Sequence, residues 1–335
     1  MNSRRRFLKT MRYETPDRVP YFEEGLRDDV LDRWHEQGLT KDADLSGMFQ
    51  TDRRERIPVN IDPLPPINKW PASRRGLKAL RKRLDPENPA RFPDDWLQRA
   101  AAWKTRDHVL ELGIHHGFFL SMGVHGWDRF NEVIQLLHDD PGLVLGIMEV
   151  HGEFSARMAE RVLKQVDVDF VSFSEPIGGE EGPLLSPRTY QEFVLSSYQP
   201  ILEVLRRHNV DVIVLVTYAN ARVLLPCILR AGFNCLWACE ANTDAMDYLT
   251  LRREFGRDLR LIGGIDLDIL AQGKDAICRE LWKRVPPLLA DGGYLPLADG
   301  RVRANVPFED YIYYRRLIQE IVEGNSKPST LEHKA

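Results

Sequence analysis

The chain has 335 residues, of which 43% are hydrophobic and 29% are charged, so it can bury the core of one large α/β domain. Its formal net charge is only -4 at pH 7, and no basic stripe alternates with aromatic residues, which argues against a nucleic-acid partner. The four cysteines form no CxxC pair, so we interpret them as small core residues rather than as zinc ligands or disulfides. They are Cys227, Cys235, Cys239 and Cys278.

The N-terminus contains a basic segment, residues 3–9, whose arginines resemble those of an export signal. A charged stretch with two prolines follows it, however, where such a signal needs an apolar region. We therefore predict an amphipathic first helix that packs Phe7, Leu8 and Met11 on the domain. No later stretch approaches the length of a membrane span, so a cytoplasmic protein without a membrane partner is expected.

The first predicted strand, residues 19–23, brings Glu23 and Glu24 to its end. A helix over residues 28–38 follows, with Val30, Leu31 and Trp34 on one face. A second short strand, residues 56–62, ends in Asp62 and a proline-rich turn. Residues 70–107 are charged and interrupted by prolines, which predicts a solvated excursion that contains a helix.

The third strand, residues 108–114, leads into His115 and His116. Helices are predicted over 128–138 and 141–166, and a fourth strand over 169–173 precedes Glu175. Residues 177–183 are rich in glycine and have the composition of a mobile lid, but they lack the spacing of a phosphate-binding loop. Ser186 and Pro187 then predict a helix start.

Three apolar runs, residues 210–216, 233–239 and 259–265, predict strands that are covered on both faces. Two helix-like segments separate them and end at Gly232 and Gly256, as helix C-termini often do. Polar residues follow each of the three runs: Tyr218 and Asn220, then Glu240, then Asp266. An eighth strand, residues 293–298, precedes Asp299 and Arg301, and a last helix covers 308–323.

Strand–helix units with reactive side chains only after the strands are typical of a (β/α)8 TIM barrel in the α/β class, although a doubly wound sheet shows the same repeat. We predict a single barrel domain over residues 1–324 with an N-terminal helical extension. Residues 325–335 are predicted to be a disordered tail.

Several short motifs resemble, in order and spacing, those of the uroporphyrinogen decarboxylase superfamily. This superfamily includes the haem-pathway decarboxylase and cobalamin-linked methyltransferases. The motifs are RRRFLKTMRYETPDRVP, SFSEPIGGEEGPLLSP, NARVLLPCILRAGFNCL, FGRDLRLIGGID and GGYLPLADGRVRANVPFEDY. The resemblance implies a (β/α)8 barrel with its site at the carboxyl ends of the strands, and a family aspartate at Asp62.

The chain departs from both branches of that superfamily. The haem-pathway enzymes hold substrate carboxylates with two arginines after the first strand, where this chain has Glu23 and Glu24, and only Arg27 lies nearby. The methyltransferases bind zinc through a histidine and a cysteine after the fifth strand, and a second cysteine near the eighth. Residues 216–220 contain neither ligand, and no cysteine occurs near Asp299. We therefore predict no zinc site of this type, no assigned metal ligand or cofactor, and a substrate other than uroporphyrinogen. Weak binding of a harder divalent ion by the strand-end carboxylates is left open.

The resemblance and the strand-end residues together predict an enzyme that acts on a small or medium carboxylated molecule, as a decarboxylase-type lyase. Asp62, Tyr218 and His115 are the predicted catalytic residues, which stabilise charge or move a proton. Arg301 is predicted to anchor a substrate carboxylate through a bidentate contact. The other predicted substrate contacts are Glu23, Glu24, Arg27, His116, Glu175, Asn220, Glu240, Asp266 and Asp299. A loop hydrogen-bonding role is the alternative for Glu175, Glu240 and Asp266, and a packed or capping role is the alternative for His116.

Two further functions stay open at this point. One is methyl transfer with a corrinoid protein as partner, and the other is a catalytically silent barrel that binds a ligand. The identity of the substrate is beyond the sequence, and a homodimer is left open as the quaternary state.

Overall fold

The computed structural model describes residues 1–67, 69–241 and 244–324. The tail predicted to be disordered, residues 325–335, lies outside the described residues. The described chain forms two compact units, one of residues 55–234 and one that combines residues 1–54 with the chain from Cys235 onward. The single barrel domain over residues 1–324 stays a prediction.

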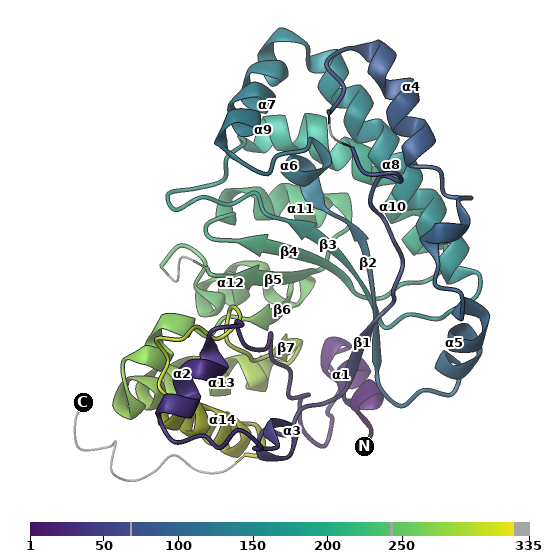
Figure 1. Ribbon diagram of the computed structural model, residues 1–335. Helices are drawn as coiled ribbons and strands as arrows, with labels where there is room; N and C mark the ends of the chain where they lie inside the picture. The colour runs from purple at the N-terminus through teal and green to yellow at the C-terminus, as the bar shows by residue number, and fades with distance from the viewer. Residues whose placement is uncertain (68, 242–243, 325–335) are drawn as a thin grey trace. The chain divides into compact units, whose positions relative to one another are not determined.

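The unit of residues 55–234 is built on three parallel strands in chain order, β2 (Val109–His115), β3 (Phe170–Glu175) and β4 (Ile213–Tyr218) (Figure 1). All seven residues of β2 are buried, as expected for a strand that is covered on both faces. The long helices α8 (Pro141–Leu163) and α10 (Ser196–Arg207) pack on each other, and α8 also packs on β2. The unit's other elements are α4 (Arg74–Arg83), η1 (Pro89–Arg91), α5 (Trp96–Trp103), α6 (Gly117–Ser121), α7 (Trp127–Asp139), α9 (Pro187–Tyr190), η2 (Gln191–Leu195), η3 (Arg222–Leu224) and α11 (Leu225–Ala231).

A β-bulge in β2 decides which side chains share a face of this sheet. Gly113 is in register with Ser172, and His115 is in register with Phe173, so the register shifts between Gly113 and His115. The ring of Phe173 lies 5.2 Å from that of Tyr198 on α10, which places His115 and Phe173 on the helix-covered face. Gly113 and Ser172 therefore lie on the opposite face, where the Ser172 hydroxyl donates to Glu111 at 2.6 Å.

The other unit contains a second set of parallel strands, β5 (Cys235–Cys239), β6 (Arg260–Gly263) and β7 (Tyr294–Leu295). Helices α13 (Lys274–Asp291) and α14 (Phe308–Val322) pack on each other, and α13 also packs on β7. The remaining elements of this unit are α1 (Ser3–Met11), α2 (Val30–Glu36), α3 (Leu45–Met48), α12 (Tyr248–Phe255), η4 (Gly256–Asp258) and η5 (Leu267–Ala271). The short strand β1 (Arg54–Arg56) lies at the sequence boundary between the two units.

Parallel strands that alternate with helices in chain order confirm the predicted α/β fold of the (β/α)8 type. The predicted helix ends are also confirmed, because α11 ends at Gly232 with φ +117° and α12 ends at Gly256 with φ +56°. Ser186 caps α9, since its hydroxyl accepts a hydrogen bond from the amide of Thr189 at 3.1 Å. Within the described part of the chain, no helix combines the length and the apolar character needed to cross a bilayer.

Two predicted strands are wrong, and proline explains both. Residues 19–23 form no regular strand, because Pro20 in the middle of the run cannot donate to a ladder; an isolated parallel bridge joins Leu26 to Val302 instead. The strand predicted over residues 56–62 covers only Arg54–Arg56, since Pro58 interrupts it. An Asx turn follows, in which the Asp62 amide donates to Oδ1 of Asn60 at 2.9 Å.

Two predictions of burial also need correction. Phe7 and Met11 of α1 are fully buried as predicted, but Leu8 is only half-buried. Leu31 of α2 is exposed, while its neighbours Val30 and Trp34 are buried.

Residues 70–107, predicted to be a solvated excursion with one helix, contain the two helices α4 and α5 instead. The excursion also buries Arg91 and Trp103. The burial of the Arg91 charge is tolerated because its guanidinium donates to backbone carbonyls, including that of Asn60 at 3.1 Å.

Candidate active site

The predicted site residues divide between the two units. The unit of residues 55–234 contains Asp62, His115, His116, Glu175, Tyr218 and Asn220. The other unit contains Glu23, Glu24, Arg27, Glu240, Asp266, Asp299 and Arg301.

A cavity of about 430 Å³ in the unit of residues 55–234 brings three histidines together, and we call it the histidine cavity. Its volume suits a small or medium ligand. Its polar lining comes from the loop after β1, the residue after β2, the end of α6, the loop before α7 and helix α8. Its apolar lining comes mainly from the proline-rich turn. The lining residues are Asn60, Asp62, Pro63, Leu64, Pro66, Ile67, Trp70, His116, Leu120, Ser121, His125 and His151.

Asp62 and His116 form an acid–base pair in this cavity. Oδ1 of Asp62 lies 3.0 Å from Nε2 of His116, and the two side chains are 69% and 36% exposed. Burial lowers the pKa of His116 most; the charge of Asp62 opposes this shift, and the charge of Arg56 adds to it. His116 is therefore a neutral imidazole at physiological pH, which can take up or pass on a proton.

His151 and Ser121 present polar atoms without a protein partner. Nε2 of His151 and the hydroxyl of Ser121 are both buried, and neither makes a hydrogen bond within the described chain. Burial lowers the pKa of His151 to about 3, so this ring is neutral as well. Its ring stacks on Trp70 with 6.0 Å between centroids. Because leaving a buried polar atom unsatisfied costs about 1–3 kcal/mol, these two groups fit a ligand that hydrogen-bonds to them.

His115, predicted to be catalytic, lies behind the cavity rather than in its lining. Its side chain is buried, and its ring packs at 4.7 Å on Tyr198 and at 6.2 Å on His151. The Gly117 amide donates to Nδ1 at 2.9 Å, which fixes the tautomer with the proton on Nε2. Burial holds the pKa of His115 well below its usual value. A catalytic role for His115 stays a prediction, whereas its neighbour His116 lines the cavity.

Glu175 is fully buried on the helix-covered face of the sheet. Its carboxylate accepts a hydrogen bond from the Phe118 amide at 2.9 Å, from the Tyr190 hydroxyl at 3.3 Å and from the Tyr198 hydroxyl. Burial raises the pKa of Glu175 to about 7, although these three donors oppose the shift. The arrangement ties α6, α9 and α10 to the end of β3, which fits the structural alternative for this residue.

Tyr218 and Asn220 lie at the end of β4, where the chain is held against the glycine-rich loop. The Asn220 amide donates to the carbonyl of Gly179 at 3.0 Å, and its side chain donates to the carbonyl of Glu181 at 3.2 Å. Between them, Ala219 has φ +49°, an uncommon value for a residue with a Cβ. Asn220 thus fixes the loop, and Tyr218 is exposed at 39%.

In the other unit, the strand-end carboxylates are largely paired with protein groups. Arg27 and Glu240 form an ion pair at 2.6 Å, and Arg303 lies 3.7 Å from Glu240. Arg27 is therefore already neutralised. Glu240 has φ +44°, and such strain in a residue that is not glycine is typical of functional sites or tight turns.

The carboxylates of Asp299 and Asp266 accept hydrogen bonds from backbone amides. The two oxygens of Asp299 accept hydrogen bonds from the amides of Ala241 at 2.9 Å and Leu267 at 3.0 Å. Burial is the main cause that raises the pKa of Asp299 to about 6. Asp266 caps η5, because its carboxylate accepts from the amide of Asp268 at 2.8 Å. Burial is also the main cause that raises the pKa of Asp266.

Glu23 and Glu24 differ in their surroundings, as the alternation of side chains predicts. The carboxylate of Glu23 accepts from the hydroxyl of Tyr314 at 2.8 Å, and burial raises its pKa to about 7. Glu24 lies 3.7 Å from the guanidinium of Arg54. These contacts place both acids among protein partners of their own unit.

Part of the guanidinium of Arg301, the predicted carboxylate anchor, already contacts other groups of its own unit. Its Nε donates to the carbonyl of Leu26 at 3.0 Å, and Nη2 lies 3.3 Å from Asp28. The side chain is still 52% exposed. Its role as an anchor stays a prediction, with part of the guanidinium already engaged.

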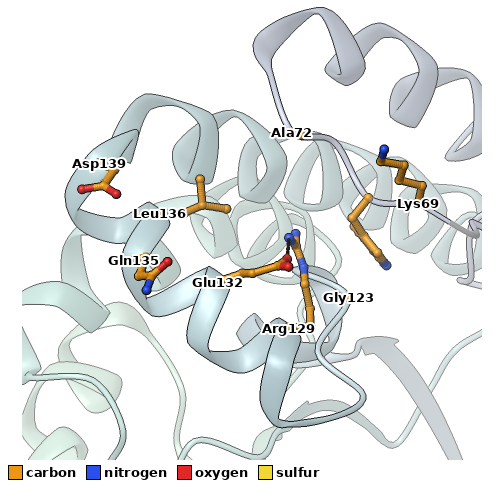
Figure 2. A pocket seen from close by; sticks show the side chains of 9 residues that line it. Lys69, Ala72, Gly123, Arg129, Glu132, Gln135, Leu136 and Asp139 are labelled. Atoms are coloured by element: carbon orange, nitrogen blue, oxygen red, sulfur yellow. Dashed lines mark hydrogen bonds and ion pairs between the residues drawn. The ribbon is translucent and has the colours of Figure 1, made fainter.

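A second, outer cavity of about 600 Å³ shares Trp70 with the histidine cavity. It lies along α7, and Figure 2 shows Arg129 and Glu132 side by side in its lining, with their ion pair at 2.9 Å. A Cβ at Gly123 would lie 2.0 Å from Nε1 of Trp70, so only glycine leaves room for the indole. Trp70 therefore separates the two cavities.

Sequence reasoning missed His151, Ser121 and Trp70. His151 lies in the middle of α8, where a single histidine looks like any residue of an amphipathic helix. Trp70 falls in the stretch that we interpreted as solvated. The glycine at position 123 makes room for the indole, but the sequence alone does not pair it with Trp70.

Metal binding has no geometric support in the described residues. Within residues 1–67, 69–241 and 244–324, no three His, Cys, Asp or Glu side chains are grouped so that they could hold a metal ion. All four cysteines are free and buried.

Comparison with known proteins gives a family and a fold. Residues 120–288 match the family described as Uroporphyrinogen decarboxylase (URO-D). A solved structure of a methyltransferase from Methanosarcina mazei superposes with a TM-score of 0.62 at 16% identity, and the match covers 96% of this chain and 99% of that one. Curated protein sequences gave no significant match. At this identity, the structural likeness shows the fold.

Proposed function

Because the chain belongs to the uroporphyrinogen decarboxylase family, we propose that it is an enzyme that uses the histidine cavity for acid–base chemistry on a small or medium carboxylated molecule. The proposed reaction is a decarboxylation of the lyase type. The observation that supports it most is the Asp62–His116 pair at 3.0 Å in a cavity with apolar walls.

The proposed roles follow from the balance of the reaction. The bond between the substrate carbon and its carboxylate breaks, CO₂ leaves, and the electron pair stays on the carbon. His116, first protonated from solvent through its exposed edge, would then pass that proton to the carbon and return to the neutral imidazole. Asp62 would orient the ring and stabilise its protonated form, as a carboxylate beside an imidazole does. His151 and Ser121 would hydrogen-bond to the substrate.

The lining also limits the substrate. His116 and His151 are neutral, and the walls carry Leu64, Ile67 and Trp70, so the cavity suits a molecule with an apolar part. No arginine or lysine is among the described residues that line the cavity, so its lining offers a polycarboxylate no cation. We therefore propose a substrate with one or two carboxylates, not uroporphyrinogen.

The test is a turnover screen that measures CO₂ release from aromatic and aliphatic mono- and dicarboxylic acids. For an acid that is turned over, His116→Gln should lower kcat by about 10²- to 10⁴-fold, the usual contribution of a general acid–base group. His138→Gln is the matched control, because His138 is 92% exposed on α7. Binding without turnover of any acid would support the silent ligand-binding barrel instead.

Methyl transfer with a corrinoid protein as partner is the second candidate. Its support is the fold shared along nearly the whole chain with the Methanosarcina mazei methyltransferase. The zinc ligands that such a reaction uses to activate a thiol are missing from residues 216–220, so a different grip on the acceptor would be needed. Spectroscopic conversion of methylcobalamin to cob(I)alamin in the presence of an acceptor would identify this activity. A cytoplasmic location belongs to the proposal under either function, since free thiols suit a reducing compartment.

A further inference from the structure

Arg56 occupies a place that β2 leaves open for it. Gly113 lies on the sheet face that α10 does not cover, and a Cβ there would lie 2.0 Å from Nη2, 2.6 Å from Cζ and 2.7 Å from Nε of Arg56. The whole guanidinium thus lies against the backbone of Gly113. Any larger residue at position 113 would push it away, because contacts below 3.0 Å do not occur for real Cβ atoms.

This guanidinium has no partner among the described residues. Arg56 is the exposed residue at the end of β1, and no carboxylate, carbonyl or hydroxyl of the described chain accepts a hydrogen bond from it. The contrast with Arg27 and Arg301 is informative, since both donate to groups of their own unit. An always-charged group with five free donors, placed on a sheet face, is suited to bind a carboxylate from solution.

Arg56 does not line the histidine cavity, but it lies near His116, which does. Gly113 and His116 are three residues apart in the chain, so their Cα atoms are at most about 10 Å apart. The positive charge of Arg56 acts on His116 strongly enough to help lower the pKa of that ring. A ligand with one aromatic ring can therefore contact His116 with one end and Arg56 with the other.

We propose that Arg56, seated on Gly113, is the anchor for the carboxylate that stays on the substrate. This inference rests on the proposed function and deepens it, because it gives the substrate class. A cation stabilises the carboxylate that it holds, so the carboxylate at Arg56 is not the one that leaves as CO₂. The substrate is then a dicarboxylate with an apolar body, and the product is the matching monocarboxylate.

The test compares two ligands that differ only in charge, benzoate and benzamide, by calorimetry and by competition. The wild-type protein should bind benzoate at least about tenfold more tightly than benzamide, because a hydrogen-bonded charge pair contributes that much. Arg56→Gln should remove this preference and leave benzamide binding within about twofold. Arg56→Lys should retain part of it. Arg81→Gln is the matched control, since Arg81 is 51% exposed on α4 of the same unit.

Gly113→Ala gives a second, independent arm. The added methyl group should displace the guanidinium and reproduce the loss of preference seen for Arg56→Gln. A wild-type protein without a preference for benzoate, or an Arg56→Gln protein that keeps the preference, would overturn the assignment. Binding is measured without turnover, so the outcome is separate from that of the proposed function: if His116→Gln abolishes decarboxylation while Arg56→Gln keeps the preference, only the anchor is wrong.

Discussion

Replacement of Glu175 by Gln tests whether this residue is a structural tie, and its effect on stability follows from the contacts of the carboxyl group. Burial raises the pKa of Glu175 from 4.5 to about 7. In the folded chain the protonated form is therefore favoured between these two values, and the folded state holds one proton more than the unfolded state. The unfolding free energy consequently falls as the pH rises from about 4.5 to about 7, and it levels off above that pH.

The size of this effect is about 2 to 3 kcal/mol between pH 5 and pH 8. Glutamine keeps one carbonyl oxygen that can accept from the Phe118 amide, its NH2 group can donate to the tyrosine oxygens, and it does not titrate. Urea unfolding at pH 5, 6, 7 and 8 measures the unfolding free energy of both proteins. The value for Glu175→Gln minus the value for the wild type should rise by about 2 to 3 kcal/mol from pH 5 to pH 8. The raised pKa values of Glu23 and Asp299 act in both proteins, so they cancel in the difference.

Glu203→Gln, at an exposed position of α10, is the control and should follow the wild type at every pH. The reasoning would be refuted if the wild type and Glu175→Gln had parallel stability curves. It would also be refuted if Glu175→Gln abolished ligand binding while its stability curve stayed unchanged.

Three further predictions concern the histidine cavity and metal binding. Asp62→Asn removes the charge that opposes the lowering of the His116 pKa, so NMR titration should show a still lower pKa; an unchanged or higher pKa would contradict the pair. Trp70→Ala should join the two cavities and improve binding of 2-naphthoate relative to benzoate, whereas Trp127→Ala, at a position 79% exposed, should not. Elemental analysis of protein purified without added metal should find far less than one zinc per chain, and a stoichiometric zinc would count against the site as described.

The sequence predicts the strands best where a run is short, apolar and free of proline. The runs that became β2 to β6 meet this condition, and each was placed within a few residues. The two prolines at positions 20 and 58 decide the failures. Each removes a backbone donor from a run whose side chains still look like a strand.

The candidate site is less predictable because a one-residue shift changes which side chain faces the cavity. The alternation of β2 puts Gly113 and His115 on the same face, but the bulge between them reverses this arrangement. As a result His116, not His115, lines the cavity, and Gly113 turns to the face where Arg56 lies. A bulge depends on the register with the neighbouring strand, which no local pattern of this chain contains.

The most direct test of the central claim is a crystal structure of the protein with a bound product-like monocarboxylate such as benzoate. The ligand should lie in the histidine cavity, with its ring in van der Waals contact with His116 and its carboxylate hydrogen-bonded to Arg56. A ligand that leaves this cavity empty and binds instead between Arg27 and Glu240 would contradict the claim.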